Sequence, residues 1–324
     1  MFFNFTAQMR KEIKRNCKAC TLENWGRCMG IQVLYLVPFV LLFIMLYIGL
    51  FGRVFSMLAQ GYVDEYQTTL ALAQGMNTAW VVMFLMLVVS GPLEYGMMRF
   101  YIGLQRGGEP GVSTLLTPFT SLQSLWEGVK MAFCLFFRRL LWIIGPAVLC
   151  TCLLVGATLN AVLSGRMLSD GAIIAIWLLY MFLTIPIEIK LQTYRAGWVL
   201  LHDGKENSVW DATGRASRAF KGQYGRLFVF GLSFIGWYIL LFGITWLCLG
   251  IGAAGLELIP GGFGIAVFAA ALVAALCLDV VLGGFLSAYV NTSFIGMYEV
   301  LSASAEPTDA PPQDNGFTPG GDSL

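Results

Sequence analysis

Residues 263–289 read FGIAVFAAALVAALCLDVVLGGFLSAY, an apolar run in which Asp279 is the only charged residue. A helix needs about 20 apolar residues to cross the hydrocarbon core of a bilayer. Backbone polar groups in lipid must be bonded within their own segment, so a run this long predicts a helix and not a strand. Five further runs share this character, and the chain predicts about six spans, near residues 30–51, 79–103, 140–163, 171–189, 227–251 and 263–289.

The composition of the whole chain agrees with these runs. Of its 324 residues, 57% are hydrophobic and only 12% are charged, whereas a soluble domain carries about 25% charged residues. This excludes an ordinary soluble fold. The net charge of +1 gives no indication of a nucleic-acid partner. The first apolar run is longer than the core of a signal peptide, about 7–15 residues, so we expect a retained helix.

The distribution of basic residues predicts the orientation. Six spans place three loops outside, and of the 20 Lys and Arg residues only Arg53 and Arg166 lie in those loops. Lys and Arg concentrate on the cytoplasmic side of membrane proteins, so both termini are expected in the cytoplasm. Residues 302–324 are rich in Pro, Gly and acids and contain no base. They predict a disordered cytoplasmic tail after a membrane domain of residues 1–301.

An amphipathic stretch precedes each odd-numbered span on the predicted cytoplasmic side. Residues 2–20, 116–133 and 209–227 each place apolar side chains at helical spacing. Thr117-Pro118 and Ser208 are plausible helix starts for the second and third stretches. The predicted fold class is an all-α membrane protein of three helical hairpins, each preceded by a cytoplasmic amphipathic interfacial helix. The recurrence of this pattern has two alternative explanations. One is a true threefold repeat of one unit, and the other is that the three stretches leading into the membrane independently use similar residues.

Three phrases carry a resemblance to a known family. They are Gly91-Pro-Leu-Glu-Tyr-Gly96, Leu232-Ser-Phe-Ile-Gly-Trp237 and Met297-Tyr-Glu-Val-Leu301. Together they resemble the bacterial integral membrane family "domain of unknown function 975", over roughly residues 10–301. The resemblance implies a multi-pass protein of the bacterial cytoplasmic (plasma) membrane. It implies no chemistry, and it supplies no active-site residues.

Three acids stand out because they lie within predicted spans. Glu94, Glu188 and Asp279 each occupy the cytoplasmic part of an even-numbered span. An acid in a span is costly and usually faces protein or water. One interpretation is ion pairing with bases near the cytoplasmic helix ends, with Arg226 or Arg139 as partners for Asp279. The other is a proton or cation relay. The candidate bases are Arg27, Arg99, Arg138, Arg139, Arg195 and Arg226.

Other reactive residues point to no catalytic site. Cys17 and Cys20 form one CxxC near Cys28, but zinc sites usually need a second pair of ligands, so apolar packing is expected. His202, the only histidine, lies in a polar turn without a nucleophile motif such as G-x-S-x-G. We expect no catalytic residue, no cofactor, no metal and no structural disulfide, and therefore not an enzyme.

Two functional hypotheses follow from these observations. The first is a non-enzymatic scaffold, assembly factor or envelope-associated factor. Its basic amphipathic helices would bind anionic inner-leaflet lipid, and its partner would be another membrane protein or a second copy of the chain. The second is a small transporter or channel that uses Glu94, Glu188 and Asp279.

Overall fold

The computed structural model describes residues 6–59, 65–165, 169–206, 208–258 and 262–305. All secondary structure in these ranges is helical, so the all-α prediction is confirmed. The elements, in chain order, are α1 (Ala7–Glu23), α2 (Trp25–Ala59), α3 (Glu65–Gln105), the 3₁₀ helix η1 (Val112–Thr120), α4 (Leu122–Leu163), α5 (Asp170–Arg195), α6 (Gly197–His202), α7 (Val209–Ala219), α8 (Tyr224–Leu232), α9 (Ile235–Leu258) and α10 (Gly262–Ala305).

The described residues contain six segments that are long and apolar enough to cross a membrane. This indicates a multi-pass membrane protein, and each predicted span overlaps one of these segments. They are Trp25–Gly49, Gly75–Gln105, Leu122–Leu163, Asp170–His202, Tyr224–Gly255 and Phe263–Ala303. Four long helices carry an internal proline: Pro38, Pro92, Pro146 and Pro186. Membrane helices tolerate proline where neighbouring groups satisfy the freed carbonyl.

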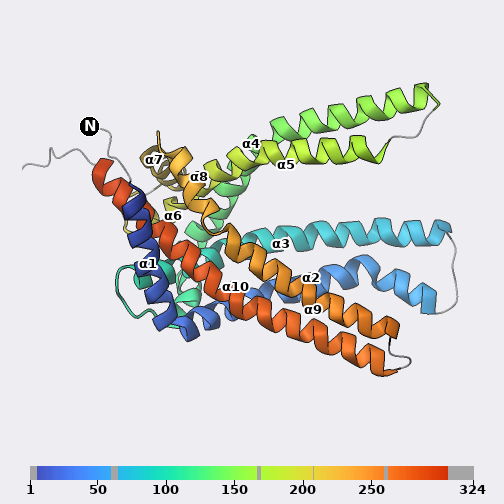
Figure 1. Cartoon of the computed structure of the whole chain (residues 1–324), viewed down its shortest axis with the longest axis horizontal. Helices are drawn as coiled ribbons and strands as arrows, with labels where there is room; N and C mark the ends of the chain where they lie inside the picture. The colour runs from blue at the N-terminus through green and yellow to red at the C-terminus, as the bar shows by residue number, and fades with distance from the viewer. Residues whose placement is uncertain (1–5, 60–64, 166–168, 207, 259–261, 306–324) are drawn as a thin grey trace, which may run out of the picture.

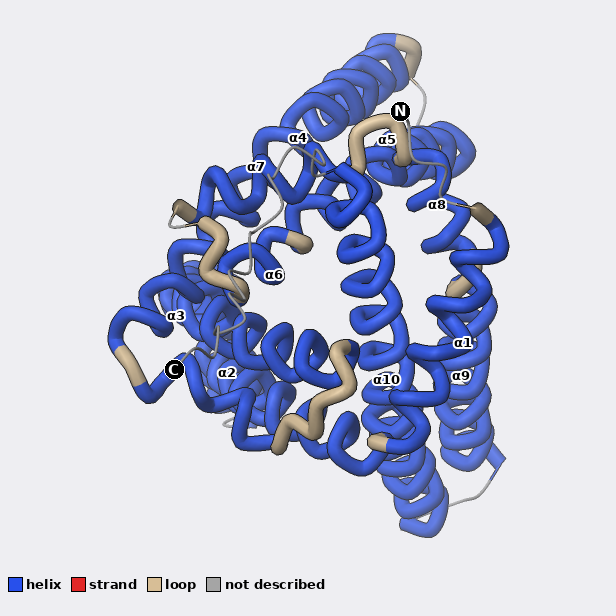
Figure 2. The backbone as a smooth tube through the Cα atoms, turned by 90° about the vertical axis from the view of Figure 1, so that its left-hand side faces the viewer, coloured by secondary structure: helices blue, strands red, loops and turns tan. Residues whose placement is uncertain are grey.

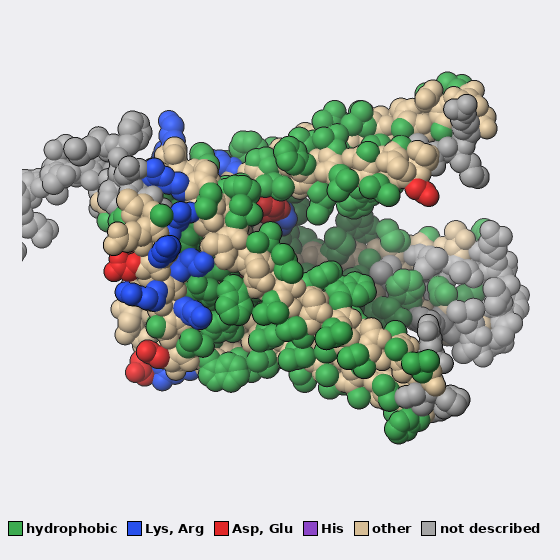
Figure 3. All heavy atoms as spheres, in the orientation of Figure 1, with side chains coloured by type: hydrophobic (Ala, Val, Ile, Leu, Met, Phe, Trp, Pro, Cys, Tyr) green, Lys and Arg blue, Asp and Glu red, His purple; other side chains and the backbone are tan. Residues whose placement is uncertain are grey.

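The long helices diverge from one end of the molecule (Figure 1). At that end α1, η1, α6 and α7 pack around the ends of the long helices, which we call their roots. Lys and Arg side chains gather on this end in the space-filling view (Figure 3). We call it the basic end, and we call the opposite ends of the long helices the far end.

The long helices pack as three pairs. α2 lies along α3, α4 along α5, and α9 along α10. A view along the long axis shows the pairs on three different sides of the molecule, with α6 between them (Figure 2). α10 also packs against α1, α2 and α3, and α3 packs against α4 near Gly91 and Gly128. The pairs are therefore joined mainly through their roots and through the short helices at the basic end.

Buried side chains concentrate at the basic end. Trp198, Tyr95, Phe100, Phe220 and Met131 are among the largest fully buried residues. The far parts of the long helices instead carry exposed large apolar side chains, such as Ile48, Leu163 and Phe263. Lipid tails are as apolar as leucine, so these side chains need no protein cover in a bilayer. The protein core is thus formed by the roots of the helices and the short elements between them.

The predicted second interfacial helix differs from the structure. Thr117 does not cap a helix, because it lies inside η1. The next helix begins at Leu122, where the Ser121 hydroxyl accepts a hydrogen bond from the backbone N–H of Ser124 at 3.2 Å. α4 then runs without a break to Leu163. From Leu122 onward, the amphipathic stretch and the third span therefore form one helix.

The third amphipathic stretch and the span that follows it contain more helix breaks than the sequence predicts. α7 ends at Ala219, and Gly222 adopts a φ of 80°, a left-handed conformation that suits glycine. The predicted span 227–251 is interrupted at Ser233, between α8 and α9. Ser208 lies at the N-cap of α7, but its side chain makes no capping hydrogen bond. Contact of these segments with lipid stays a prediction.

Several sequence predictions fall partly or wholly outside the described residues, including residues 2–5 of the first amphipathic stretch. Of the predicted tail 302–324, residues 302–305 belong to α10, and the rest is not described. Arg166, in the second predicted outside loop, is not described either.

Candidate functional site

The phrase Gly91-Pro-Leu-Glu-Tyr-Gly96 lies where α3 enters the basic end, and its glycines bring backbones together. A Cβ atom on Gly91 would overlap the carbonyl oxygen of Gly128 in α4. A Cβ atom on Gly96 would overlap the carbonyl of Leu115 in η1 and lie 2.8 Å from its Cα. Only glycine allows so close an approach. These contacts fix α3 against α4 and η1, and so they position Glu94 between the helices.

Glu94 pairs with Arg195 at the end of α5. Its Oε1 atom accepts hydrogen bonds from Arg195 Nη2 at 2.9 Å and from Nε at 3.1 Å. The side chains are only 20% and 31% exposed, respectively. This ion pair joins the first helical pair to the second.

Glu188 pairs with Arg139, one helix away. Arg139 Nη2 donates to Glu188 Oε1 at 2.6 Å and so links α4 to α5. Both side chains are about half exposed, Arg139 at 57% and Glu188 at 47%. Because both side chains are partly exposed, this pair leaves charge accessible to another molecule.

Asp279 has a different partner from the one expected. Its Oδ1 atom accepts a hydrogen bond from the Thr245 hydroxyl at 2.6 Å, which links α10 to α9. Among the described residues Asp279 makes no ion pair. Of the two bases expected as its partners, Arg139 pairs with Glu188 and Arg226 donates to Gln223 at 2.9 Å. The expected pairing of Asp279 with either base is therefore not observed.

The remaining candidate bases serve the packing of the basic end. Arg27 pairs with Glu109 at 2.9 Å on the surface. The Arg99 guanidinium lies 4.3 Å from the ring centre of Tyr95, which stacks on Trp198. Arg138 donates to the Trp210 carbonyl at 3.0 Å and lies 3.9 Å from the centre of the Trp210 ring. Cation–π contacts of this kind hold arginines in place without a carboxylate.

The CxxC cysteines also have packing roles. Cys17 Sγ donates to Gln105 Oε1 at 3.0 Å, and Cys20 Sγ donates to the Leu104 carbonyl at 3.3 Å. Burial raises the pKa of the Cys17 thiol to about 11. The thiol is therefore protonated at neutral pH, and the thiolate is the reactive form of cysteine. His202, at the end of α6, is exposed.

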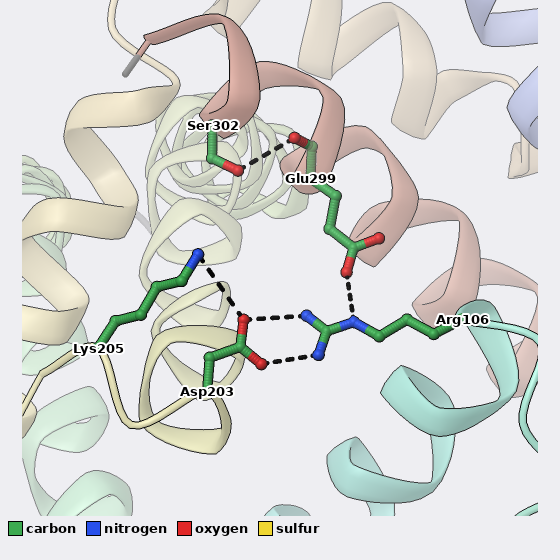
Figure 4. Close-up of polar contacts among 5 residues, drawn as sticks. All are labelled: Arg106, Asp203, Lys205, Glu299 and Ser302. Carbon is green, nitrogen blue, oxygen red and sulfur yellow. Dashed lines mark hydrogen bonds and ion pairs between the residues drawn. The ribbon is translucent and has the colours of Figure 1, made fainter. Parts of the chain in front are cut away.

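One charged cluster escaped the sequence analysis (Figure 4). Arg106 donates to both carboxylate oxygens of Asp203, at 2.7 and 3.0 Å, and to Glu299 at 2.8 Å. Lys205 Nζ lies 4.0 Å from Asp203. The cluster joins the ends of α3, α6 and α10 at the basic end. These residues lie outside or at the margin of the predicted spans, where a charged residue is not unusual and so does not indicate a site.

Arg106 lowers the pKa of Asp203 in this cluster. Burial alone would raise the pKa of the Asp203 carboxyl, but the hydrogen bonds and charge of Arg106 hold it below its ordinary value of 3.8. In return, the Asp203 hydrogen bond raises the pKa of Arg106, against the effect of burial and with help from Glu299. Both groups are charged at neutral pH.

Asp203→Asn is expected to lower the melting temperature in detergent by roughly 2–4 °C at pH 7. The folded pKa of Asp203 is lowered, so its stabilising effect is present above 3.8 and is lost as the pH falls below that value. The difference between wild type and variant should therefore shrink as the pH is lowered from 5 to 3. Melting curves across this range measure it, with the exposed Asp211→Asn in α7 as control. A difference that stays constant would contradict the prediction.

Two cavities adjoin the paired charges. One, of about 360 Å³, is lined by Glu94, Arg139, Glu188 and Arg195, among others. The other, of about 710 Å³, is mainly apolar and also reaches Glu188 and Arg195. The arrangement can hold a molecule beside the charges, whereas the ion pairs themselves connect helices.

The comparisons with known proteins give one match. A family profile described as "Protein of unknown function (DUF975)" matches residues 5–304. No curated protein and no solved structure matches the chain.

Proposed function

The chain belongs to the family described as "Protein of unknown function (DUF975)", and we propose that it is a non-enzymatic scaffold or assembly factor of the bacterial cytoplasmic membrane. One observation carries this proposal. Glu94 and Glu188, which a relay would use, are instead engaged by Arg195 and Arg139 in pairs that join α3, α4 and α5. Such pairs hold the roots of the helices in a fixed arrangement. The divergent far parts then offer apolar surfaces to a partner within the bilayer.

The partner in this proposal is a second membrane protein or a second copy of the chain. Single exposed apolar residues need no explanation, but long apolar surfaces mark contact with lipid or protein. The basic end faces the cytoplasm in the same proposal. There its Lys and Arg side chains would attract anionic inner-leaflet lipid, at about 1 kcal/mol per residue near the surface.

Reporter fusions test the orientation. Alkaline phosphatase, which is active only outside the cytoplasm, should be active when fused at Gln67 and inactive when fused at Asn315. The reason is the concentration of Lys and Arg on the side assigned to the cytoplasm. A fluorescent protein that matures only in the cytoplasm should give the opposite pattern and serves as the control. Phosphatase activity at Asn315 would defeat the six-span orientation.

A small transporter remains the second candidate, and Asp279 favours it. This acid lies within an apolar segment, and its partner is a hydroxyl rather than a base. Ionisable residues in membrane segments often mark an ion or substrate path.

Water access separates the two candidates. The test uses Leu278→Cys, beside Asp279, in a variant whose eight native cysteines are replaced. For a scaffold, a small charged thiol reagent should label this position at least tenfold more slowly than Lys205→Cys, which is exposed at the basic end. Thiolate formation needs water, so a packed or lipid-covered thiol reacts slowly. Equal labelling rates at the two positions would replace the scaffold with the transporter.

A further inference from the structure

The two cavities meet on one face of α5. The smaller lies among α3, α4 and α5, and the larger lies among α2, α3, α5, α8, α9 and α10. Both are lined by Glu188, Gln192 and Arg195. These residues follow a helical spacing of four and three, so they share a side of the helix. The two cavities therefore adjoin one another at a junction formed by these three side chains.

The polar groups at the junction have unused bonding capacity. Among the described residues, Arg195 donates hydrogen bonds only to Oε1 of Glu94, and the Arg139 side chain donates only to Oε1 of Glu188. Within the described residues, the second oxygen of each carboxylate accepts no hydrogen bond, and Arg139 donates through Nη2 alone. Gln32 also lines the larger cavity, and its Oε1 atom is buried without a partner among the described residues. Buried polar atoms nearly always have a partner, so the junction is suited to a ligand with both donors and acceptors.

The rest of the larger cavity is mainly apolar. Its walls include Met97, Ile185, Phe228, Ile235 and Leu286. Its volume, about 710 Å³, lies within the range of small-molecule sites, about 300–1,000 Å³. A small hydrophilic solute would leave these walls uncovered. Hydrocarbon chains would cover them.

Charge complementarity selects among lipids. The junction and the smaller cavity beside it hold two acids, Glu94 and Glu188, and two bases, Arg139 and Arg195, so their formal charge is zero. A lipid with a net negative headgroup would add an unbalanced charge, whereas a zwitterionic headgroup would not. All four residues lie in the halves of their helices nearer to the basic end. They are thus placed toward the headgroups of the leaflet on that side.

We propose that this junction binds one phospholipid whose headgroup carries both a primary ammonium and a phosphodiester. The ammonium donates to the free carboxylate oxygens of Glu188 and Glu94. The phosphodiester accepts from the unused guanidinium donors of Arg139. The acyl chains occupy the larger cavity, beside Phe228 and Leu286. The site is separate from the partner surfaces of the proposed scaffold.

Native mass spectrometry of the full, delipidated chain tests the proposal. Phosphatidylethanolamine and phosphatidylglycerol with identical acyl chains are added in equal amounts. We expect one bound phosphatidylethanolamine per chain, retained about tenfold more than phosphatidylglycerol, because a charged hydrogen bond is lost with the latter. Arg139→Gln/Glu188→Gln removes the pair without stranding a charge and should weaken this binding about tenfold. Lys130→Gln, an exposed change on the same helix, should leave it unchanged.

A steric variant keeps the test independent of the charges. Gly283 lines the larger cavity, and a Cβ atom there would meet nothing within 4 Å. Gly283→Leu should therefore fill the acyl-chain space and reduce retention about tenfold, without lowering the melting temperature. Gly243→Leu, equally unobstructed but outside the cavity, is the matched control. Equal retention of both lipids, or unchanged retention in both Gly283→Leu and the double variant, would overturn the proposal.

Discussion

Gly128→Leu is expected to lower the free energy of unfolding by about 3 kcal/mol, since forcing side-chain atoms into a closely packed contact costs about 1–3 kcal/mol. A Cβ atom at Gly128 would lie 2.8 Å from both the N and Cα atoms of Pro92. These are backbone atoms of α3, which cannot turn aside as a flexible side chain can. The two helices would have to separate, and the contact that positions Glu94 would be lost with them.

Thermal unfolding in detergent measures this effect, with size-exclusion chromatography as a check on assembly. Gly156→Leu is the matched control, because Gly156 is on the same helix and a Cβ atom there would meet nothing within 4 Å. Leucine favours helices more than glycine does, by roughly 0.5–1 kcal/mol, so this control should melt at or above the wild-type temperature. Similar destabilisation by both changes would show that the close approach at Gly128 is not the cause.

Glu94→Gln should have the second-largest effect, a destabilisation of about 3 kcal/mol, at the lower end of the range for a buried pair that loses one partner. The amide that replaces the Glu94 carboxylate would be neutral, and Arg195 would keep its charge with only 31% of its side chain exposed. Removing both charges in Glu94→Gln/Arg195→Gln should cost less than the sum of the single changes, because no charge is left without its partner.

The exposed pair of Arg27 and Glu109 provides the comparison for this double-mutant cycle. Glu109 is 79% exposed and Arg27 is 41% exposed, and a surface pair contributes about 0–1 kcal/mol. Glu109→Gln should therefore barely change the melting temperature. Additive effects of the Glu94 and Arg195 changes would mean that the two side chains act independently, against the geometry described above.

The fold class was readable from the sequence because its signal is local. Apolar runs such as residues 263–289 need only their own length to predict a helix. Helix boundaries at the basic end depend instead on competing local groups. Ser121 rather than Thr117 caps the helix that follows η1. The segment that leads from α7 into the fifth span is broken near Gly222. The three amphipathic stretches that precede the odd-numbered spans resemble one another less in structure than in sequence.

The candidate site was predictable only as a set of residues. An acid within a span must find a partner, so Glu94 and Glu188 were identified together with bases that included Arg195 and Arg139. Which base meets which acid depends on how separate helical pairs pack, and no local pattern encodes that. Asp279 shows the limit most clearly, because its partner is the Thr245 hydroxyl on the neighbouring helix. The Arg106 cluster depends on the same long-range packing.

The length of α10 has a mechanical consequence. It runs from Gly262 to Ala305 as one helix of 44 residues, about 66 Å long at 1.5 Å per residue. The bilayer core is only about 30 Å thick, so a substantial part of the helix lies beyond it. At the basic end Glu299 is held by Arg106. If α10 tilts by about 10° around its midpoint, each end moves by about 6 Å. The helix can therefore act as a lever, by which a force applied at the far end would reach the Arg106 cluster as a displacement of Glu299.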